Sequence, residues 1–364
     1  MAICNPKNER IKRKYFEYQK EAHQKSQSTI DNIRKSITRY EKHTNYKDLK
    51  TFNKDKAIDF KKYLSLSKAK GKNEALSKST LLSTTRNLKD FFKWLAYQPG
   101  YKSKINLLHI DYLNLSEKET RIAKAQKFKE YPTLEQIEKV ILNMPVNTEI
   151  EKRDRALIAF TLLSGMRDRA IASLRLKHID IERKLVKQDP REVKTKFSKA
   201  INTFFFPVGD PFEQIFKEWI DYLYKEKLYN NNDPVFPRTK LSLDKNQMFT
   251  AYELEPICWN SANQIRKIFK EAFEQAGLTY FTPHTFRNTL VNLGERICQT
   301  PEQFKAWSQN LGHEQVLTTF NSYGYITPDK QGEIIKNINS KKKEDNSMEE
   351  LNKKFDLLLQ KGAV

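Results

Sequence analysis

The sequence predicts a mainly α-helical protein with one small antiparallel β-sheet, an α+β architecture divided into two domains. Three observations lead to this prediction. Apolar residues recur at helical spacing along most of the 364 residues. Residues 184–207 instead form short runs rich in Val, Thr, Ile and Phe, separated by turn residues. The balance of charge also changes near residue 130, which suggests two parts with different surfaces.

The net charge of +21 is concentrated in the first third of the chain. Residues 1–130 hold 31 Lys and Arg against 14 Asp and Glu, a net charge of +17, whereas residues 131–364 hold 35 against 31, a net charge of +4. A basic segment that also contains aromatic residues is typical of proteins that neutralise a polyanion. DNA or RNA is therefore the expected partner.

Several classes of protein are disfavoured by composition. No apolar run approaches the roughly 20 residues needed to span a bilayer, and the N-terminus has no apolar stretch of signal-peptide length. Cys4, Cys258 and Cys298 are far apart and form no C-x-x-C pair, which argues against a disulfide framework. We expect a cytoplasmic, DNA-associated protein with no membrane partner.

The first 100 residues are expected to form an all-helical domain after a basic N-terminal segment, residues 1–24. Helices are predicted over 28–40, around 57–64 and over 79–97, the last ending before the helix breakers Pro99 and Gly100. The helical domain is thus placed at 25–100. Residues 101–130 show no clear period and are expected to be a linker.

A second domain is expected over residues 131–340. Thr133 and Gln136 form a capping box that opens a helix, a long apolar helix runs from Asp154 to Gly165, and a shorter one follows from Arg167 towards 177. The antiparallel sheet has turns at 189–190 and 197–198. Further helices are predicted over 212–228 and 261–276, and from 283, 301 and near 329; Ser261 and Gln264 would cap the helix over 261–276.

The C-terminal segment, residues 341–364, is predicted to contain an amphipathic helix. Ser347 and Glu350 form a capping box, and the apolar residues that follow fall on one face: Met348, Leu351, Phe355, Leu358 and Leu359. An exposed apolar stripe has to be covered. It can dock on its own domain or on a neighbouring copy, and the sequence leaves both open.

The usual signatures of nucleotide- and metal-dependent enzymes do not occur. The sequence contains no G-x-x-x-x-G-K-[ST], G-x-G-x-x-G, H-E-x-x-H or G-x-S-x-G motif. Its six histidines include no pair at i, i+4. We therefore expect no cofactor and no metal site.

Cations are instead spread over the second domain. Arg167 follows Gly165 and Met166 at the predicted start of a helix, where a positive charge opposes the helix dipole at a cost of about 0.3–1 kcal/mol. An anionic ligand would offset this cost, as would solvent or a salt bridge to Asp168. His284 and Arg287, three residues apart in the sequence TPHTFR, would share one helix face.

The order of these motifs is more specific than any one of them. SGMR, a lysine-bearing hairpin, HTFR, LGH and a tyrosine about ten residues later follow one another over about 160 residues. Together they resemble the tyrosine recombinase family, also called phage integrases. The resemblance covers residues 25–326, since the basic helical domain matches the family's core-binding domain and the second domain its catalytic domain.

The resemblance implies a set of catalytic residues. Arg167 and Arg287 would grip the scissile phosphate, His284 and His313 would contact it, and the nucleophile would be Tyr323. Tyr323 lies ten residues after His313, whereas the family spacing is nine. The alternative nucleophile is Tyr325.

The catalytic lysine would be Lys196, at the tip of the sequence VKTKFSKA, with Lys194 and Lys199 as alternatives because the hairpin register is not fixed by sequence. The family usually has an acidic residue three positions after the first arginine. Here that position is Ala170, so Asp168 or another carboxylate would have to orient Arg167.

The implied function is site-specific DNA recombination through a 3′-phosphotyrosyl intermediate, for a mobile element or phage. The implied partners are inverted-repeat core sites in double-stranded DNA, three further copies of the chain in a tetramer, and an accessory DNA-bending protein. Two alternatives remain open: a type IB topoisomerase that relaxes DNA as a monomer, and a non-catalytic DNA-binding protein derived from a recombinase.

Overall fold

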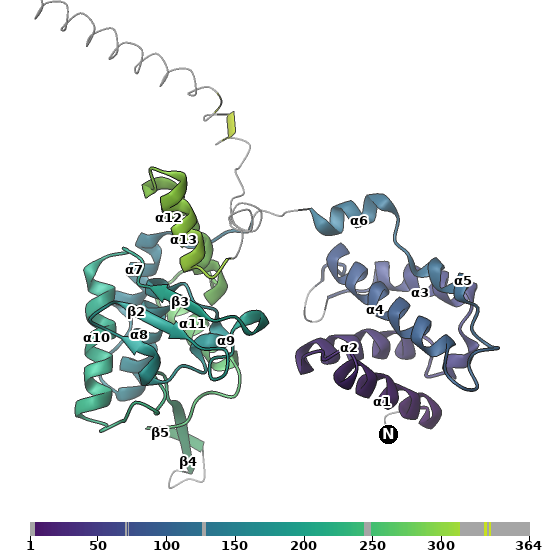
Figure 1. Cartoon of the computed structure of the whole chain (residues 1–364), viewed down its shortest axis with the longest axis horizontal. Helices are drawn as coiled ribbons and strands as arrows, with labels where there is room; N and C mark the ends of the chain where they lie inside the picture. Colours follow the sequence, from purple (N-terminus) through teal and green to yellow (C-terminus); the bar gives the residue numbers. More distant parts are fainter. Residues whose placement is uncertain are drawn as a thin grey trace, which may run out of the picture. The chain divides into compact units, whose positions relative to one another are not determined.

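The computed structural model describes residues 4–69, 71, 73–125, 129–243, 249–313, 331–332 and 335. The chain forms two compact units, Met1–Ala125 and Gln126–Val364 (Figure 1). Each has its own hydrophobic core.

The first unit is built from helices, with one isolated β-bridge between Lys68 and Ala75 among its described residues. Its helices are α1 (Pro6–Glu21), α2 (Gln27–His43), α3 (Lys54–Leu66), α4 (Lys78–Ala96), α5 (Leu107–Ile110) and α6 (Glu117–Lys124). The predicted helices at 28–40, 57–64 and 79–97 are confirmed as α2, α3 and α4. Aromatic rings fill the space between them, with Phe52 stacked on Phe92 at a centroid distance of 3.9 Å and Tyr40 edge-on to Phe60 at 5.2 Å.

Two stretches expected outside the helical domain contribute to its core. Residues 1–24 contain α1, whose Tyr15 is buried against Phe91 at 5.0 Å. Residues 101–130, expected as a linker, contain α5 and α6, and four of their side chains are buried in the core: Tyr101, Ile105, Ile110 and Leu113. The linker expectation was wrong over 101–125, which belongs to the first compact unit: its buried side chains are divided between a loop, α5 and a 3₁₀ turn, so no single apolar period runs through it.

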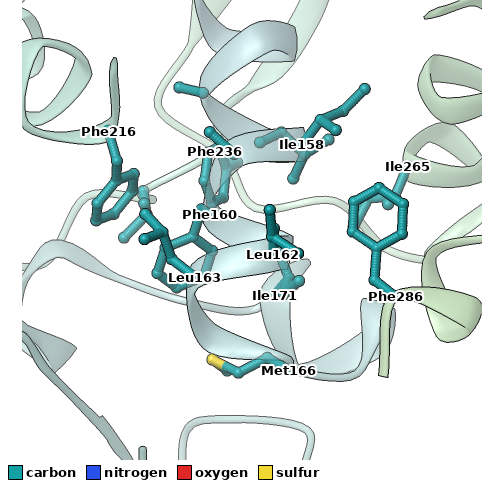
Figure 2. Close-up of a cluster of buried hydrophobic side chains, with 14 of the residues drawn as sticks. Ile158, Phe160, Leu162, Leu163, Met166, Ile171, Phe216, Phe236, Ile265 and Phe286 are labelled. Atoms are coloured by element: carbon teal, nitrogen blue, oxygen red, sulfur yellow. The ribbon is translucent and has the colours of Figure 1, made fainter. Parts of the chain in front are cut away.

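The second unit surrounds one buried helix, α8 (Glu149–Ser164), of which every residue from 156 to 164 is buried. Around it lie α7 (Leu134–Asn143), α10 (Asp210–Lys225), α11 (Asn263–Gln275), α12 (Phe286–Ile297) and α13 (Pro301–Asn310). Figure 2 shows Phe160 and Leu162 on α8, with Phe216 and Phe236 towards one side and Phe286 towards the other. This helix is the common packing partner of the elements that carry the site.

The predicted antiparallel sheet is confirmed and has three strands. β1 (Ile179–Asp180), β2 (Leu185–Gln188) and β3 (Ile201–Phe204) pair in the order β1-β2-β3. A second pair, β4 (Arg238–Leu243) and β5 (Phe249–Glu255), was not predicted. Arg153 of α8 is 1% exposed and donates to Thr239 Oγ1 at 2.8 Å, a contact across 86 residues that no local pattern reveals.

Helix boundaries in this unit follow their caps. The capping box of Thr133 and Gln136 opens α7 as predicted. α8 begins at Glu149 and not at Asp154, because Thr148 caps it together with Glu151.

Two further helix predictions differ from the structure. The predicted box of Ser261 and Gln264 does not form, since Ala262 is the N-cap of α11 and has no side-chain cap. The predicted helix from 167 to 177 is only α9 (Asp168–Ile171), followed by a 3₁₀ turn, η3 (Leu176–His178). Of the predicted helix near Asp329 only residues 331, 332 and 335 are described, and these are helical; the predicted helix in 341–364 lies outside the described residues.

Candidate active site

The corner between α8 and α9 is built around Gly165. Its backbone is left-handed, with φ of +56°, and a Cβ there would lie 2.8 Å from Leu290 Cδ1 and 2.9 Å from Leu311 Cδ2. Only glycine combines this conformation with such close packing. The turn lets α8 end in the core and directs the next residues, Met166 and Arg167, towards a pocket.

Arg167 is the N-cap residue of α9 and lines this pocket. Its neighbour Asp168 pairs with Arg266 of α11, at 2.9 Å from Nε and 2.7 Å from Nη2. Ala170, at the position where the resemblance calls for an acid, is 2% exposed and packs in the core. The Asp168–Arg266 pair joins residues 98 positions apart and was not predicted from the sequence.

Arg287 lies on the first turn of α12 and is 2% exposed. Its Nη1 donates to the carbonyl oxygen of Gly165, and its Nη2 donates to the carbonyl oxygen of Leu311 at 2.6 Å and to Nε2 of His313 at 2.9 Å. One guanidinium therefore connects the SGMR corner, the HTFR helix and the LGH segment. The structure thus brings these three motifs into contact.

Both histidines of the site sit in a strongly positive environment. The pKa of His284 is lowered to about 4, by the loss of solvent around its ring and then by the charges of Arg287 and Arg167. The pKa of His313 is lowered to about 3 by burial and by the same two arginines, with Lys196 contributing. Both rings are neutral at pH 7 in the DNA-free protein.

The lysine-bearing hairpin joins β2 to β3 and is anchored at its base. The backbone N–H of Lys194 donates to Ser173 Oγ at 2.9 Å, and His178 Nε2 lies 2.8 Å from Glu192 Oε2. Ser173 and His178 belong to the segment that follows α9. The hairpin is thus fixed to the same part of the chain that carries Arg167.

The three lysines of the hairpin have different surroundings. Lys196 lines the pocket together with Arg167 and Arg287. The charge of Lys194 instead acts on the thiol of Cys258, and Lys199 Nζ lies 5.7 Å from the Phe197 ring. Of the three, only Lys196 is among the residues that line this pocket.

Polar residues that the sequence did not single out form one wall of the pocket. Gln188 Nε2 donates to Thr203 Oγ1 at 2.9 Å, and Thr203 Oγ1 donates to the carbonyl oxygen of Asn310 at 3.2 Å. All three residues line the pocket. The sheet that carries Gln188 and Thr203 was expected from the sequence, but the contact of β3 with the end of α13, more than 100 residues away, was not.

The arrangement suits an anion. Two arginines and one lysine line one pocket from three separate parts of the sequence, while the described residues offer no group of three His, Cys, Asp or Glu that could hold a metal ion. Guanidinium groups bind phosphate oxygens with two charged hydrogen bonds.

The predicted nucleophiles, Tyr323 and Tyr325, lie outside the described residues. None of the described helices is both long and apolar enough to cross a membrane.

Two family models match the chain. The model of the phage integrase family matches residues 130–329, and the model of the phage integrase N-terminal SAM-like domain matches residues 13–99. Among known proteins, tyrosine recombinase XerC of Corynebacterium glutamicum is 22% identical over 251 residues, which is 68% of this chain and 68% of that protein.

Solved structures share the fold. A lambda integrase tetramer bound to a Holliday junction has a TM-score of 0.57 and 14% identity, over 88% of this chain and 79% of that one. The Tn1549 transposon integrase in complex with transposon right end DNA has a TM-score of 0.55 and 14% identity, over 90% and 99% of the two chains. The match extends through both units of the chain.

Proposed function

Because the chain belongs to the phage integrase family of tyrosine recombinases, which break and rejoin DNA, we propose that it exchanges DNA strands at specific sites through a 3′-phosphotyrosyl intermediate. One observation carries the proposal: Arg167, Lys196 and Arg287 line a single pocket although they lie on three separate segments. Such a pocket matches the charge that develops on a phosphodiester under attack.

In the proposed reaction the phenolic oxygen of Tyr323 attacks the scissile phosphorus, and the bond from phosphorus to the next 5′-oxygen breaks. Negative charge grows on the two non-bridging oxygens, where Arg167 and Arg287 provide charged donors, so that no metal is needed. Attack of a 5′-hydroxyl on the phosphotyrosine reverses the step. The bond energy is conserved, and resealing needs no ATP.

Two protons have to move in this step. A free tyrosine has a pKa of about 10, so Tyr323 must lose a proton to act at neutral pH. His284 is neutral there, because its pKa is lowered to about 4, and it can accept a proton or a hydrogen bond. Lys196 is the proposed acid that protonates the leaving 5′-oxygen.

We propose that the first unit supplies most of the DNA affinity. Its charge supports this, since residues 1–125 carry 29 Lys and Arg against 13 Asp and Glu. The core-binding domain was expected over 25–100 and the catalytic domain over 131–340. Because α1, α5 and α6 belong to the same compact unit, we propose that the DNA-binding part extends over Met1–Ala125.

We further propose that four copies act on two duplexes with inverted-repeat sites, aided by a DNA-bending protein, to integrate or excise a mobile element or phage in the cytoplasm. The lambda integrase tetramer and the transposon integrase with the same fold support this role. The predicted apolar face of 341–364 would dock on a neighbouring copy.

Deletion of residues 341–364 tests the docking proposal. Recombination and cooperative binding should both fall, while binding of one copy to DNA stays. A matched pair of variants gives the control: Leu351→Ser with Leu358→Ser on the predicted apolar face should have the effect of the deletion, whereas Lys353→Ser with Lys354→Ser should not. Unchanged cooperativity and recombination in the deletion variant would overturn the proposal.

The function itself is tested by capturing covalent adducts. Fragmented host and element DNA is incubated with the protein and denatured in detergent, and the protein-bound fragments are sequenced. Adducts at one inverted-repeat sequence, followed by exchange between two plasmids that carry it, are expected. Relaxation of any supercoiled plasmid by single copies would favour a type IB topoisomerase. Binding without any adduct would favour a non-catalytic descendant.

A further inference from the structure

Phe197 occupies an unusual position at the tip of the β2–β3 hairpin. Its side chain is 77% exposed, and its backbone is left-handed, with φ of 62° and ψ of 25°. This conformation is rare for a bulky residue, and the surrounding structure has to sustain it. Folding alone gives no reason to place an aromatic ring here, since the ring buries little surface.

Two lysine side chains lie near the ring, which directly follows two residues that line the pocket. Lys196 Nζ is 4.9 Å and Lys199 Nζ 5.7 Å from its centroid. Thr195 and Lys196, the two residues before Phe197, both line the pocket. Any polyanion that brings a phosphate to Arg167 and Lys196 therefore also brings its neighbouring nucleotides to the ring.

Leu228 shows that exposure and backbone conformation do not define a site by themselves. It is 81% exposed and also left-handed, with φ of 54°, in the loop after α10. It is not among the residues that line the pocket. What distinguishes Phe197 is its place beside Lys196, and Leu228 provides a control with matched exposure and backbone.

On the basis of the proposed function, we infer that Phe197 is a DNA wedge: its ring inserts against the base on the 5′-hydroxyl side of the scissile phosphate and unstacks it. The side follows from Lys196, which lies against the ring and is the proposed acid for the leaving 5′-oxygen. Apolar side chains that enter a base step unstack it, and aromatic rings stack on any base. Phe197 thereby helps to expose the bond that breaks.

The test uses a duplex of the mapped cleavage sequence with 2-aminopurine as the first base on the 5′-hydroxyl side, because this base fluoresces more when it is unstacked. The proteins are the full chain with Tyr323→Phe, alone or combined with Phe197→Asn, Phe197→Trp or Leu228→Asn. Asparagine tolerates the left-handed backbone, so Phe197→Asn removes the ring and keeps the turn. A second duplex carries 2-aminopurine six base pairs away, an offset of about half a helical turn.

The fluorescence of the duplex with the probe beside the cleavage site should rise when the Tyr323→Phe protein binds, and also when its Phe197→Trp or Leu228→Asn variant binds. The fluorescence of the duplex with the distant probe should not change. Phe197→Asn should abolish the rise and, with Tyr323 intact, slow cleavage by about 5- to 150-fold, as expected for one lost base–aromatic contact. An equal rise with Phe197→Asn, or slower cleavage without any change in fluorescence, would overturn the wedge. Absence of cleavage by the unaltered protein would instead remove the proposed function, and this inference with it.

Discussion

Arg287 Nη2 donates a hydrogen bond to Nε2 of His313 across 2.9 Å in the buried part of the site. A guanidinium has no acceptor, so Nε2 of His313 carries the lone pair and Nδ1 carries the proton. The arrangement agrees with the pKa of His313, which is lowered to about 3. Nε2 therefore cannot donate a hydrogen bond to a phosphate until the ring gains a proton or its proton moves from Nδ1 to Nε2.

Arg287→Ala should lower the rate of cleavage by about 100-fold or more, because it removes donors to the charged oxygens of the transition state. DNA binding should change by no more than about threefold, since many phosphate contacts share the affinity. Arg287→Lys keeps the charge but not the paired donors, and should also be inactive. Adduct formation measures cleavage, and fluorescence anisotropy measures DNA binding. An equal loss of binding and cleavage would contradict the catalytic role of Arg287.

The same substitution should reduce stability. The buried guanidinium satisfies the carbonyl oxygens of Gly165 and Leu311, and its removal leaves both without this partner. We expect the free energy of unfolding to fall by about 2 to 5 kcal/mol, measured by urea denaturation. Cleavage is therefore compared at a temperature at which circular dichroism shows both proteins folded.

DNA binding should raise the pKa of both histidines, since an anion offsets the charges of Arg167 and Arg287 that lower them. NMR titration of histidine-labelled Tyr323→Phe protein, with and without a cleavage-site duplex, measures the change. Titration of His284 and His313 at the same pH in both samples would show that no phosphate enters the pocket.

The lowered pKa values also predict the pH dependence of stability. An unfolded histidine has a pKa of about 6.5, so below this pH the unfolded chain binds protons that folded His284 and His313 do not. The free energy of unfolding should therefore fall as the pH drops from about 6.5 towards 4. His313→Asn should make this decline shallower, and an unchanged slope in urea denaturation would contradict the lowered pKa of His313.

Substitution of Lys196 should affect one chemical step. Lys196→Met is expected to slow cleavage by about 100- to 10,000-fold, because the leaving 5′-oxygen loses its acid. A substrate with sulfur in place of that oxygen needs no proton to leave, so it should restore cleavage by Lys196→Met. It should not rescue Arg287→Ala. Rescue of Lys194→Met or Lys199→Met, but not of Lys196→Met, would move the role to another lysine of the hairpin.

The packing of α12 on α13 depends on Gly294. A Cβ at this position would lie 2.6 Å from Trp307 Nε1, and the indole cannot move away without losing its hydrogen bond to the Leu290 carbonyl oxygen at 2.9 Å. Gly294→Ala should lower the free energy of unfolding by about 1–3 kcal/mol, although alanine favours a helix. In the Trp307→Phe background the cost of Gly294→Ala should largely vanish. An equal cost in both backgrounds would contradict the clash.

The sequence predicted the elements that local patterns determine. The apolar stripe of α2, the capping box of α7 and the left-handed end of α8 at Gly165 are each contained in a few neighbouring residues. The motif order further predicted that Arg167, His284, Arg287 and His313 share a site, and the contacts and charges of the structure bring them together.

Contacts between residues far apart in the sequence could not be predicted from local patterns. The hydrogen bond from Arg153 to Thr239 and the pairing of Asp168 with Arg266 depend on the tertiary fold. The role of residues 101–125 in the first core was hidden for a similar reason, since their buried side chains come from a loop and from short helical turns that share no single apolar period. Phe197 is conspicuous only once its exposure and backbone conformation are known.

The central claim is that a tyrosine forms a covalent bond with DNA, and the nucleophile can be tested directly. The unaltered protein, Tyr323→Phe and Tyr325→Phe are each incubated with the mapped cleavage site, and the adduct is digested and located by mass spectrometry. We predict a phosphotyrosyl peptide at Tyr323 in the unaltered protein and in Tyr325→Phe, and none in Tyr323→Phe. An undiminished adduct in Tyr323→Phe would contradict this account and move the nucleophile to Tyr325 or elsewhere.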